Sequence, residues 1–282
     1  MAKDEAEALA AGRAVRGRIN YLGDMAEKPR FHAQEHARDN IAYAPREVTI
    51  WNGRAMAEAP SLQREGVTLA AHPTAVRDFE DAEEVAAVYG GEVESLLLEL
   101  TGARRVTVLK QALVRYANRS PRYKTGVNSQ PARFPHLDFS AATAPGLTAN
   151  AAFGAAAVRL RPGERLVGYN VWRVISQPPQ DTPLAVCDQR SIAAGDLALA
   201  DGVYDHGPEP WPTMEAYMLR PNPDHRWIYF RDMRPDEALV FKGYEAGAGW
   251  TTGAAHSAFD DPSCPEDAPA RISLETRAFA VF

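Results

Sequence analysis

Short runs of hydrophobic residues, each closed by Pro, Gly, Asp or Asn, follow one another through the second half of the chain. Within several runs polar and apolar positions alternate, which is the period of a half-buried strand. Regularly spaced short strands with turn signals between them are typical of a sandwich, barrel or jelly roll. The strands we expect lie in FPHLDFS, ERLVGYNVWRVIS, PLAVCDQRSI, TMEAYML, RWIYFRDM, EALVFKGYE and ARISLETRAFAVF.

A helical pattern is clear only in DAEEVAAVYGGEVESLLLELTG. Asp81 with Glu84 three residues later has the spacing of a capping box, and Gly90-Gly91 predicts a break into two short helices. The next stretch, RRVTVLKQALVRYA, predicts one long strand. The alanine-rich LTANAAFGAAAVRL predicts a short helix inside the β-rich half.

These patterns predict one mainly β domain over residues 1–282, a double-stranded β-helix (jelly roll, cupin-like) with flanking α-helices. Residues 1–75 lack a clear period apart from a strand in VRGRINYL, and we expect an irregular N-terminal elaboration there. Residues 76–282 would hold the supporting helices and the jelly-roll core. No internal repeat and no linker divides the chain.

Composition and charge exclude several classes of function. A net charge of -6 argues against a nucleic-acid partner, which needs a basic face. No apolar run reaches the roughly 18 residues that a membrane-spanning helix requires, so we expect no membrane partner. The acidic, alanine-rich start does not resemble a secretory signal, and Cys187 and Cys264 lack metal spacing. We therefore expect a cytoplasmic protein with reduced thiols, in which exposed apolar strands would allow a homodimer.

Among the seven histidines, most predict surface or structural positions. His32 and His36 could share a helix face but lie in a charged segment that predicts a surface arm. His206 and His225 lie among turn residues and predict solvated side chains. His136 differs from these four, because a carboxylate follows two positions later in HLD.

On a strand, His136 and Asp138 point to the same face and could reach one ion. His256, in TTGAAHSAFDDP, is the best candidate for a third ligand, because small residues around it leave room for other groups. Two histidines and one carboxylate are the ligand set of non-haem Fe(II) oxygenases. The simpler interpretation of HLD, a polar turn in an apolar strand, remains open at this point.

The C-terminal strand ARISLETRAFAVF carries a polar face made of Arg271, Ser273, Glu275 and Arg277. Two arginines inside a jelly roll would be costly unless they met an anion. A guanidinium fork with a hydroxyl two residues later suits a carboxylate. The alternative is a solvent-exposed face on which Glu275 pairs with an arginine.

HLD, NVWRVISQPPQDTPLAVCDQRSI, DEALVFKGYE and HSAFDDP followed by ARISLETRAF together resemble a known family. It comprises cephamycin-methoxylation-type proteins and fungal hydroxylase/desaturase proteins, with endoperoxide-forming enzymes among them. The resemblance runs from about Val76 to the C-terminus. It implies an Fe(II)- and 2-oxoglutarate-dependent oxygenase on a jelly roll.

The resemblance also implies the roles of the residues. His136, Asp138 and His256 would hold Fe(II), and Arg271 with Ser273 would bind the distal carboxylate of 2-oxoglutarate. With O2 as second cosubstrate, oxidative decarboxylation would give succinate, CO2 and a ferryl oxidant. Hydrogen-atom removal from a small-molecule substrate, of specialised-metabolite or amino-acid type, would then lead to hydroxylation, desaturation or cyclisation.

Some assignments stay open from the sequence. Arg277 is the alternative clamp for 2-oxoglutarate, since the family's Arg-Arg-Ser arrangement is here Ala270-Arg271-Ile272-Ser273. Asn170 and Trp172 share one strand face and could support the site or contact substrate, whereas Arg173 faces the other way. Two other classes of protein also fit the pattern: a metal-cupin dioxygenase or isomerase that uses no cosubstrate, and a non-catalytic jelly-roll binding protein.

Overall fold

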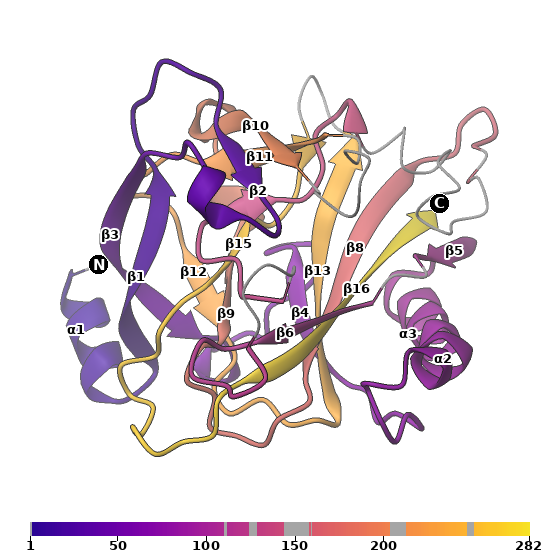
Figure 1. The fold of residues 1–282 in the computed structure, drawn as a ribbon, viewed down its shortest axis with the longest axis horizontal. Coiled ribbons are helices and arrows are strands. Elements are labelled where there is room, and N and C mark those ends of the chain that lie inside the picture. The colour runs from indigo at the N-terminus through magenta and orange to yellow at the C-terminus, as the bar shows by residue number, and fades with distance from the viewer. Residues whose placement is uncertain are drawn as a thin grey trace.

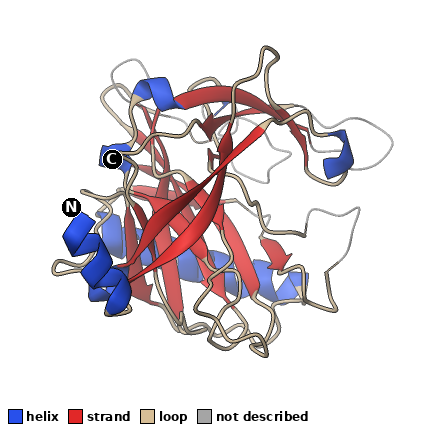
Figure 2. Ribbon diagram, turned by 90° about the vertical axis from the view of Figure 1, so that its left-hand side faces the viewer, coloured by secondary structure: helices blue, strands red, loops and turns tan. Residues whose placement is uncertain are grey.

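The computed structural model describes residues 2–109, 112–123, 129–143, 158, 160–203, 213–246 and 251–282. Within these ranges most regular structure is β-strand, arranged in two curled sheets that face each other (Figures 1 and 2). Most strand pairs are antiparallel, and the mainly β jelly-roll prediction is confirmed. In this part of the chain no helix is long and apolar enough to cross a membrane.

One sheet has nine described strands in the order β1-β3-β12-β9-β15-β7-β11-β10-β2. Three of them, β1, β2 and β3, come from the first 75 residues, so this segment is part of the sheet. The strands are β1 (Ala14–Leu22), β2 (Arg30–His32), β3 (Tyr43–Asn52), β7 (His136–Leu137), β9 (Leu184–Cys187), β10 (Leu197–Val203), β11 (Met214–Leu219), β12 (Trp227–Tyr229) and β15 (His256–Ala258).

The other sheet follows the order β14-β13-β8-β16-β5, with β4 paired to β13 and β6 paired to β16. The prediction of one long strand over RRVTVLKQALVRYA is wrong, because β5 and β6 pair with different halves of β16. The strands are β4 (Val67–Ala71), β5 (Arg105–Val108), β6 (Leu113–Tyr116), β8 (Leu166–Val174), β13 (Glu237–Ala246), β14 (Thr251–Thr252) and β16 (Ile272–Val281).

Alternate residues of strand β8 face the interior between the two sheets and the outer, helix-covered face of the second sheet. Trp172 packs in the interior, in one hydrophobic cluster with residues of β9 and β12. Val171 packs on the outer face against the helices, and Arg173 on that face is fully buried. The predicted strand phase is therefore correct, since Arg173 lies on the face opposite Trp172.

The helices within residues 82–101 cover the outer face of the second sheet (Figure 1). Asp81 caps them as predicted, since its side chain accepts hydrogen bonds from the N–H groups of Glu83 and Glu84. The predicted break at Gly90-Gly91 is wrong, because a π-helical turn joins the two helices and Gly90 keeps helical dihedrals. The helices are α1 (Ala2–Ala10), α2 (Ala82–Glu84), the π-turn η3 (Val85–Tyr89) and α3 (Gly90–Thr101); the short 3-10 turns are η1 (His36–Arg38), η2 (Gly53–Ala55), η5 (Gln189–Ser191) and η6 (Ala194–Asp196).

Two histidine predictions are wrong. His32 is buried at the edge of the larger sheet, and His225 is buried rather than solvated. The imidazole of His225 loses water because Tyr21 of β1, distant in sequence, stacks against it, which local turn signals do not reveal. His206 and nearly all of LTANAAFGAAAVRL lie outside the described residues.

Candidate metal centre

Three side chains that are distant in sequence meet in the interior between the sheets. His136 is the first residue of β7, Asp138 follows that strand, and His256 begins β15. The two strands are neighbours, and His136 and His256 are directly paired, with ring centroids 4.3 Å apart. One ligand atom from each of the three residues lies within 4.8 Å of the others, and all three residues are buried.

Each imidazole can offer a ring nitrogen to a metal ion. His136 Nδ1 lies 2.9 Å from the carbonyl oxygen of Phe134 and donates to it, so that Nε2 carries the lone pair. Burial lowers the pKa of His256 to about 3. Within the described ranges neither ring nitrogen of His256 has a hydrogen-bond partner. Buried acceptor nitrogens beside a carboxylate fit a divalent transition metal.

Asp138 is held by residues of the opposite sheet. Arg277 Nη2 lies 2.7 Å from Oδ1, and Asn170 Nδ2 donates to Oδ2 over 2.6 Å. Burial alone would raise the pKa of Asp138. The charge of Arg277, with the hydrogen bond from Asn170, acts in the opposite direction, and the pKa lies well below its usual range. The carboxylate is therefore ionised and oriented before any ligand arrives.

The polar face of β16 points into the interior, so the solvent-exposed alternative is wrong. Arg271 is buried, and its Nη1 donates to Ser273 Oγ over 2.5 Å. In the described part of the chain its Nε and Nη2 have no hydrogen-bond partner, and its guanidinium lies 5.5 Å from the ring of Trp172. Burial lowers the pKa of Arg271 to about 9. A buried guanidinium with open donors fits an anion.

Arg277 is engaged differently from Arg271. Besides Asp138, it contacts the Glu275 carboxylate at 2.6 Å, so that Arg277 links two carboxylates, one of which is a candidate metal ligand. These contacts place Arg277 beside a candidate metal ligand.

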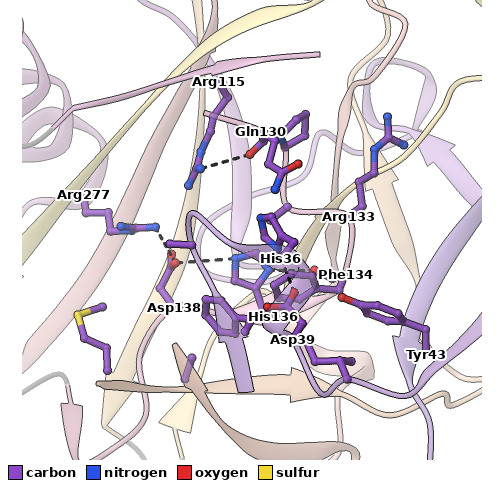
Figure 3. A pocket seen from close by; sticks show the side chains of 17 residues that line it. His36, Asp39, Tyr43, Arg115, Gln130, Arg133, Phe134, His136, Asp138 and Arg277 are labelled. Carbon is purple, nitrogen blue, oxygen red and sulfur yellow. Dashed lines mark hydrogen bonds and ion pairs between the residues drawn. The ribbon is translucent and has the colours of Figure 1, made fainter. Parts of the chain in front are cut away.

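A cavity of about 360 Å³ opens in front of His136 and Asp138 (Figure 3). Much of its wall is apolar or aromatic. The ring of Phe134 is tilted against that of His136, with centroids 5.1 Å apart, and it also lies near Phe31 and Tyr43, with ring centroids 5.4 and 6.4 Å away. An aromatic row therefore leads from the cavity wall to a candidate metal ligand.

Sequence reasoning missed the contribution of the N-terminal segment and of β6 to this cavity. Phe31, Ile41 and Tyr43 line it, as does His36, whose Nδ1 lies 3.0 Å from Asp39 Oδ2. Arg115 reaches it from β6. Their aromatic and charged character gives a weak signal, but which strand they approach depends on pairing between distant segments.

A jelly roll in which two imidazoles and one carboxylate converge between the sheets is the arrangement of non-haem iron oxygenases. The chain belongs to the family described as "Oxidoreductase/YMDC permease-like domain", which matches residues 19–282.

Named relatives agree with this class. The chain is 31% identical over 244 residues to the Fe(II)/2-oxoglutarate-dependent dioxygenase nvfI of Aspergillus novofumigatus, covering 84% of each chain. It is 31% identical over 240 residues to the hydroxylase/desaturase efuI of Hormonema carpetanum, covering 79% of each. A solved structure of the iron and alpha-ketoglutarate-dependent endoperoxidase NvfI superposes with a TM-score of 0.79 at 26% identity, over 95% of this chain and 97% of that one. The chain is therefore an oxidoreductase of the Fe(II)/2-oxoglutarate-dependent dioxygenase class.

Proposed function

We propose that His136, Asp138 and His256 bind Fe(II), and that the enzyme uses 2-oxoglutarate and O2 to hydroxylate, desaturate or cyclise a small molecule. Succinate and CO2 would leave as coproducts. The observation that carries the proposal is the convergence of three buried ligand atoms within 4.8 Å of one another. Two imidazoles and one carboxylate suit Fe(II) and leave other coordination positions open.

Arg271 and Ser273 bind the distal carboxylate of 2-oxoglutarate in this proposal. The open donors of Arg271 and its hydrogen bond to Ser273 support the assignment. Arg277 is already engaged by Asp138 and Glu275, which favours Arg271 as the clamp. When bound, iron with its two cosubstrates supplies the oxidising power of the reaction.

The protein's own residues position the reactants and exclude water. Asn170 and Arg277 hold Asp138, and Phe241 packs against His256 with ring centroids 4.6 Å apart. The aromatic row formed by Phe31, Tyr43 and Phe134 supports a substrate with a largely apolar body, packed in the cavity so that one C–H bond lies near the metal.

Anaerobic titration of the apoprotein with Fe(II) and 2-oxoglutarate tests the proposal. We expect a visible metal-to-ligand charge-transfer band with the wild-type protein. His136→Ala should abolish the band, and Arg271→Ala should require far more 2-oxoglutarate to reach it. His36→Ala is the matched control, because His36 lines the same cavity without belonging to the cluster.

A folded wild-type protein that gives no band would contradict the proposal. A band that survives in His136→Ala would leave the dioxygenase class intact but remove His136 from the ligand set. Circular dichroism on each variant separates loss of a ligand from loss of the fold.

A further inference from the structure

Arg115 enters the interior directly beside the residues proposed to hold the cosubstrate. Strand β6 pairs antiparallel with β16, and the register sets Arg115 opposite Ser273. Side chains of directly opposed residues emerge on the same face of a sheet. Because the Ser273 hydroxyl contacts Arg271 in the interior, Arg115 emerges on this same face.

Arg115 also belongs to the cavity in front of the metal candidates, together with His136 and Asp138. Figure 3 shows its side chain extending from β6 toward the pair formed by Asp138 and Arg277. Arg115 Nη1 donates to the carbonyl oxygen of Gln130 over 3.2 Å, which fixes the orientation of the guanidinium. Arg115 therefore lies opposite Ser273 and also lines the cavity in front of His136 and Asp138.

Cationic side chains are crowded at this position. Burial lowers the pKa of Arg271, Asp181 counteracts this effect, and the positive charges of Arg115 and Arg133 add to the lowering. Guanidinium groups that repel each other in a buried region are stabilised by an anion placed between them. A carboxylate has two oxygens with about four acceptor positions, enough for two guanidiniums and a hydroxyl.

We propose that Arg115 is a second arginine of the cosubstrate site and binds the distal carboxylate of 2-oxoglutarate together with Arg271 and Ser273. This inference rests on the proposed function. The competing role for Arg115 is to bind an acidic group of the substrate, and the two roles predict different binding behaviour.

The test measures 2-oxoglutarate binding to Arg115→Gln, by the charge-transfer band of the anaerobic Fe(II) protein. Loss of a charge-assisted hydrogen-bond partner predicts a Kd for 2-oxoglutarate raised about 10- to 100-fold. The affinity for Fe(II) alone should stay unchanged. Arg115→Lys keeps the positive charge but loses the forked guanidinium. Its Kd for 2-oxoglutarate should therefore lie between those of the wild type and Arg115→Gln.

Arg105→Gln is the matched control. Arg105 also lies on a strand that pairs with β16, but its side chain is exposed and pairs with Glu164 at 2.6 Å, away from the cavity. We expect its Kd for 2-oxoglutarate to stay close to the wild-type value. 2-Oxobutyrate, which lacks the distal carboxylate, provides a second control: its weaker binding should be the same in Arg115→Gln and in the wild type.

The outcomes separate the inference from the function on which it rests. A wild-type band with an unchanged 2-oxoglutarate Kd in Arg115→Gln overturns the inference alone and favours the substrate role. Equal losses for 2-oxoglutarate and 2-oxobutyrate also overturn it, since Arg115 would then not act on the distal carboxylate. If Arg115→Gln does not fold, Arg115→Lys decides by the same comparison. Absence of a band in the wild type overturns the proposed function and the inference with it.

Discussion

The side-chain amide of Asn170 lies 2.6 Å from Oδ2 of Asp138, although the two residues belong to opposite sheets. Asn170 is paired across β8 and β16 with Arg277, which holds the other oxygen of the same carboxylate. One sheet therefore supplies all three candidate metal ligands, and two cross-strand neighbours of the other sheet fix the orientation of the only anionic one.

Removing either support of Asp138 should weaken metal binding while leaving every ligand in place. We expect Asn170→Ala and Arg277→Met each to lower the affinity for Co(II) by about 10- to 100-fold, the usual effect of losing a partner of a metal ligand. Isothermal titration calorimetry measures this directly. Asn222→Ala is the control, since it removes an equivalent Asn–Asp contact, to Asp196, outside the cavity. Wild-type affinity in Asn170→Ala would show that the amide does not orient the ligand.

Gly243 provides the space that Asn170 occupies. It lies at a register shift between β13 and β8, and a Cβ atom at this position would come within 2.5 Å of Asn170 Oδ1. Gly243→Ala should displace the amide and weaken Co(II) binding, with a stability loss of about 1–3 kcal/mol from overpacking. At Gly195 an added Cβ meets nothing within 4 Å, so Gly195→Ala should change neither quantity. Calorimetry and urea unfolding of both variants test the difference.

Much of the site could be predicted because the period of a strand is local. The alternation of residues places His136 with Asp138, and Arg271 with Ser273, on common faces whatever the rest of the chain does. The choice of His256 as the third candidate ligand followed from chemistry, since a metal site needs more than two ligands. Strands that alternate in this way also predicted the jelly roll.

The remaining features depend on register between distant strands. Nothing near Arg115 indicates that it will lie opposite Ser273, and the bulge at Gly243 appears only once β13 and β8 are paired. His225 looks solvated among turn residues, yet Tyr21 from β1 stacks against it with ring centroids 5.5 Å apart. Local signals do not contain these long-range contacts.

A buried histidine outside the site should make the stability of the protein depend on pH. Arg173 Nη2 donates to His72 Nδ1 at 2.5 Å, so the imidazole must be neutral to accept. Burial, followed by the charge of Arg173, lowers the pKa of His72 below its usual value. As the pH falls below about 6.5, the unfolded chain binds a proton that the folded state resists, so stability declines.

We therefore expect the free energy of unfolding to fall between pH 7.5 and 5.5, with His72 contributing at most about 1.4 kcal/mol per pH unit. His72→Asn keeps an acceptor for Arg173 but cannot titrate, so its stability should decline less over the same range. Urea unfolding at several pH values measures both curves. Parallel curves for the two proteins would show that His72 does not titrate on unfolding.

A second buried polar network stabilises the larger sheet away from the cavity. Trp227 Nε1 donates to the Tyr21 hydroxyl over 2.7 Å. The hydroxyl lies 3.1 Å from His225 Nδ1, and the other ring nitrogen of His225 lies 3.1 Å from Asp196 Oδ2. If Nε2–H of His225 donates to Asp196, Nδ1 accepts from the Tyr21 hydroxyl, and every residue of this hydrogen-bond network has a partner.

Tyr21→Phe should therefore destabilise the fold without affecting the metal centre. Loss of the hydroxyl leaves the Trp227 N–H and His225 Nδ1 buried without their partner, at a cost of about 2–4 kcal/mol. Chemical unfolding measures this loss, and Co(II) affinity should remain at the wild-type value because none of these residues lines the cavity. Tyr43→Phe, at a half-exposed ring, should cost far less. Equal stability losses in the two variants would contradict the role of this network. They would mean that leaving Trp227 and His225 without a buried partner costs no more than removing an exposed hydroxyl.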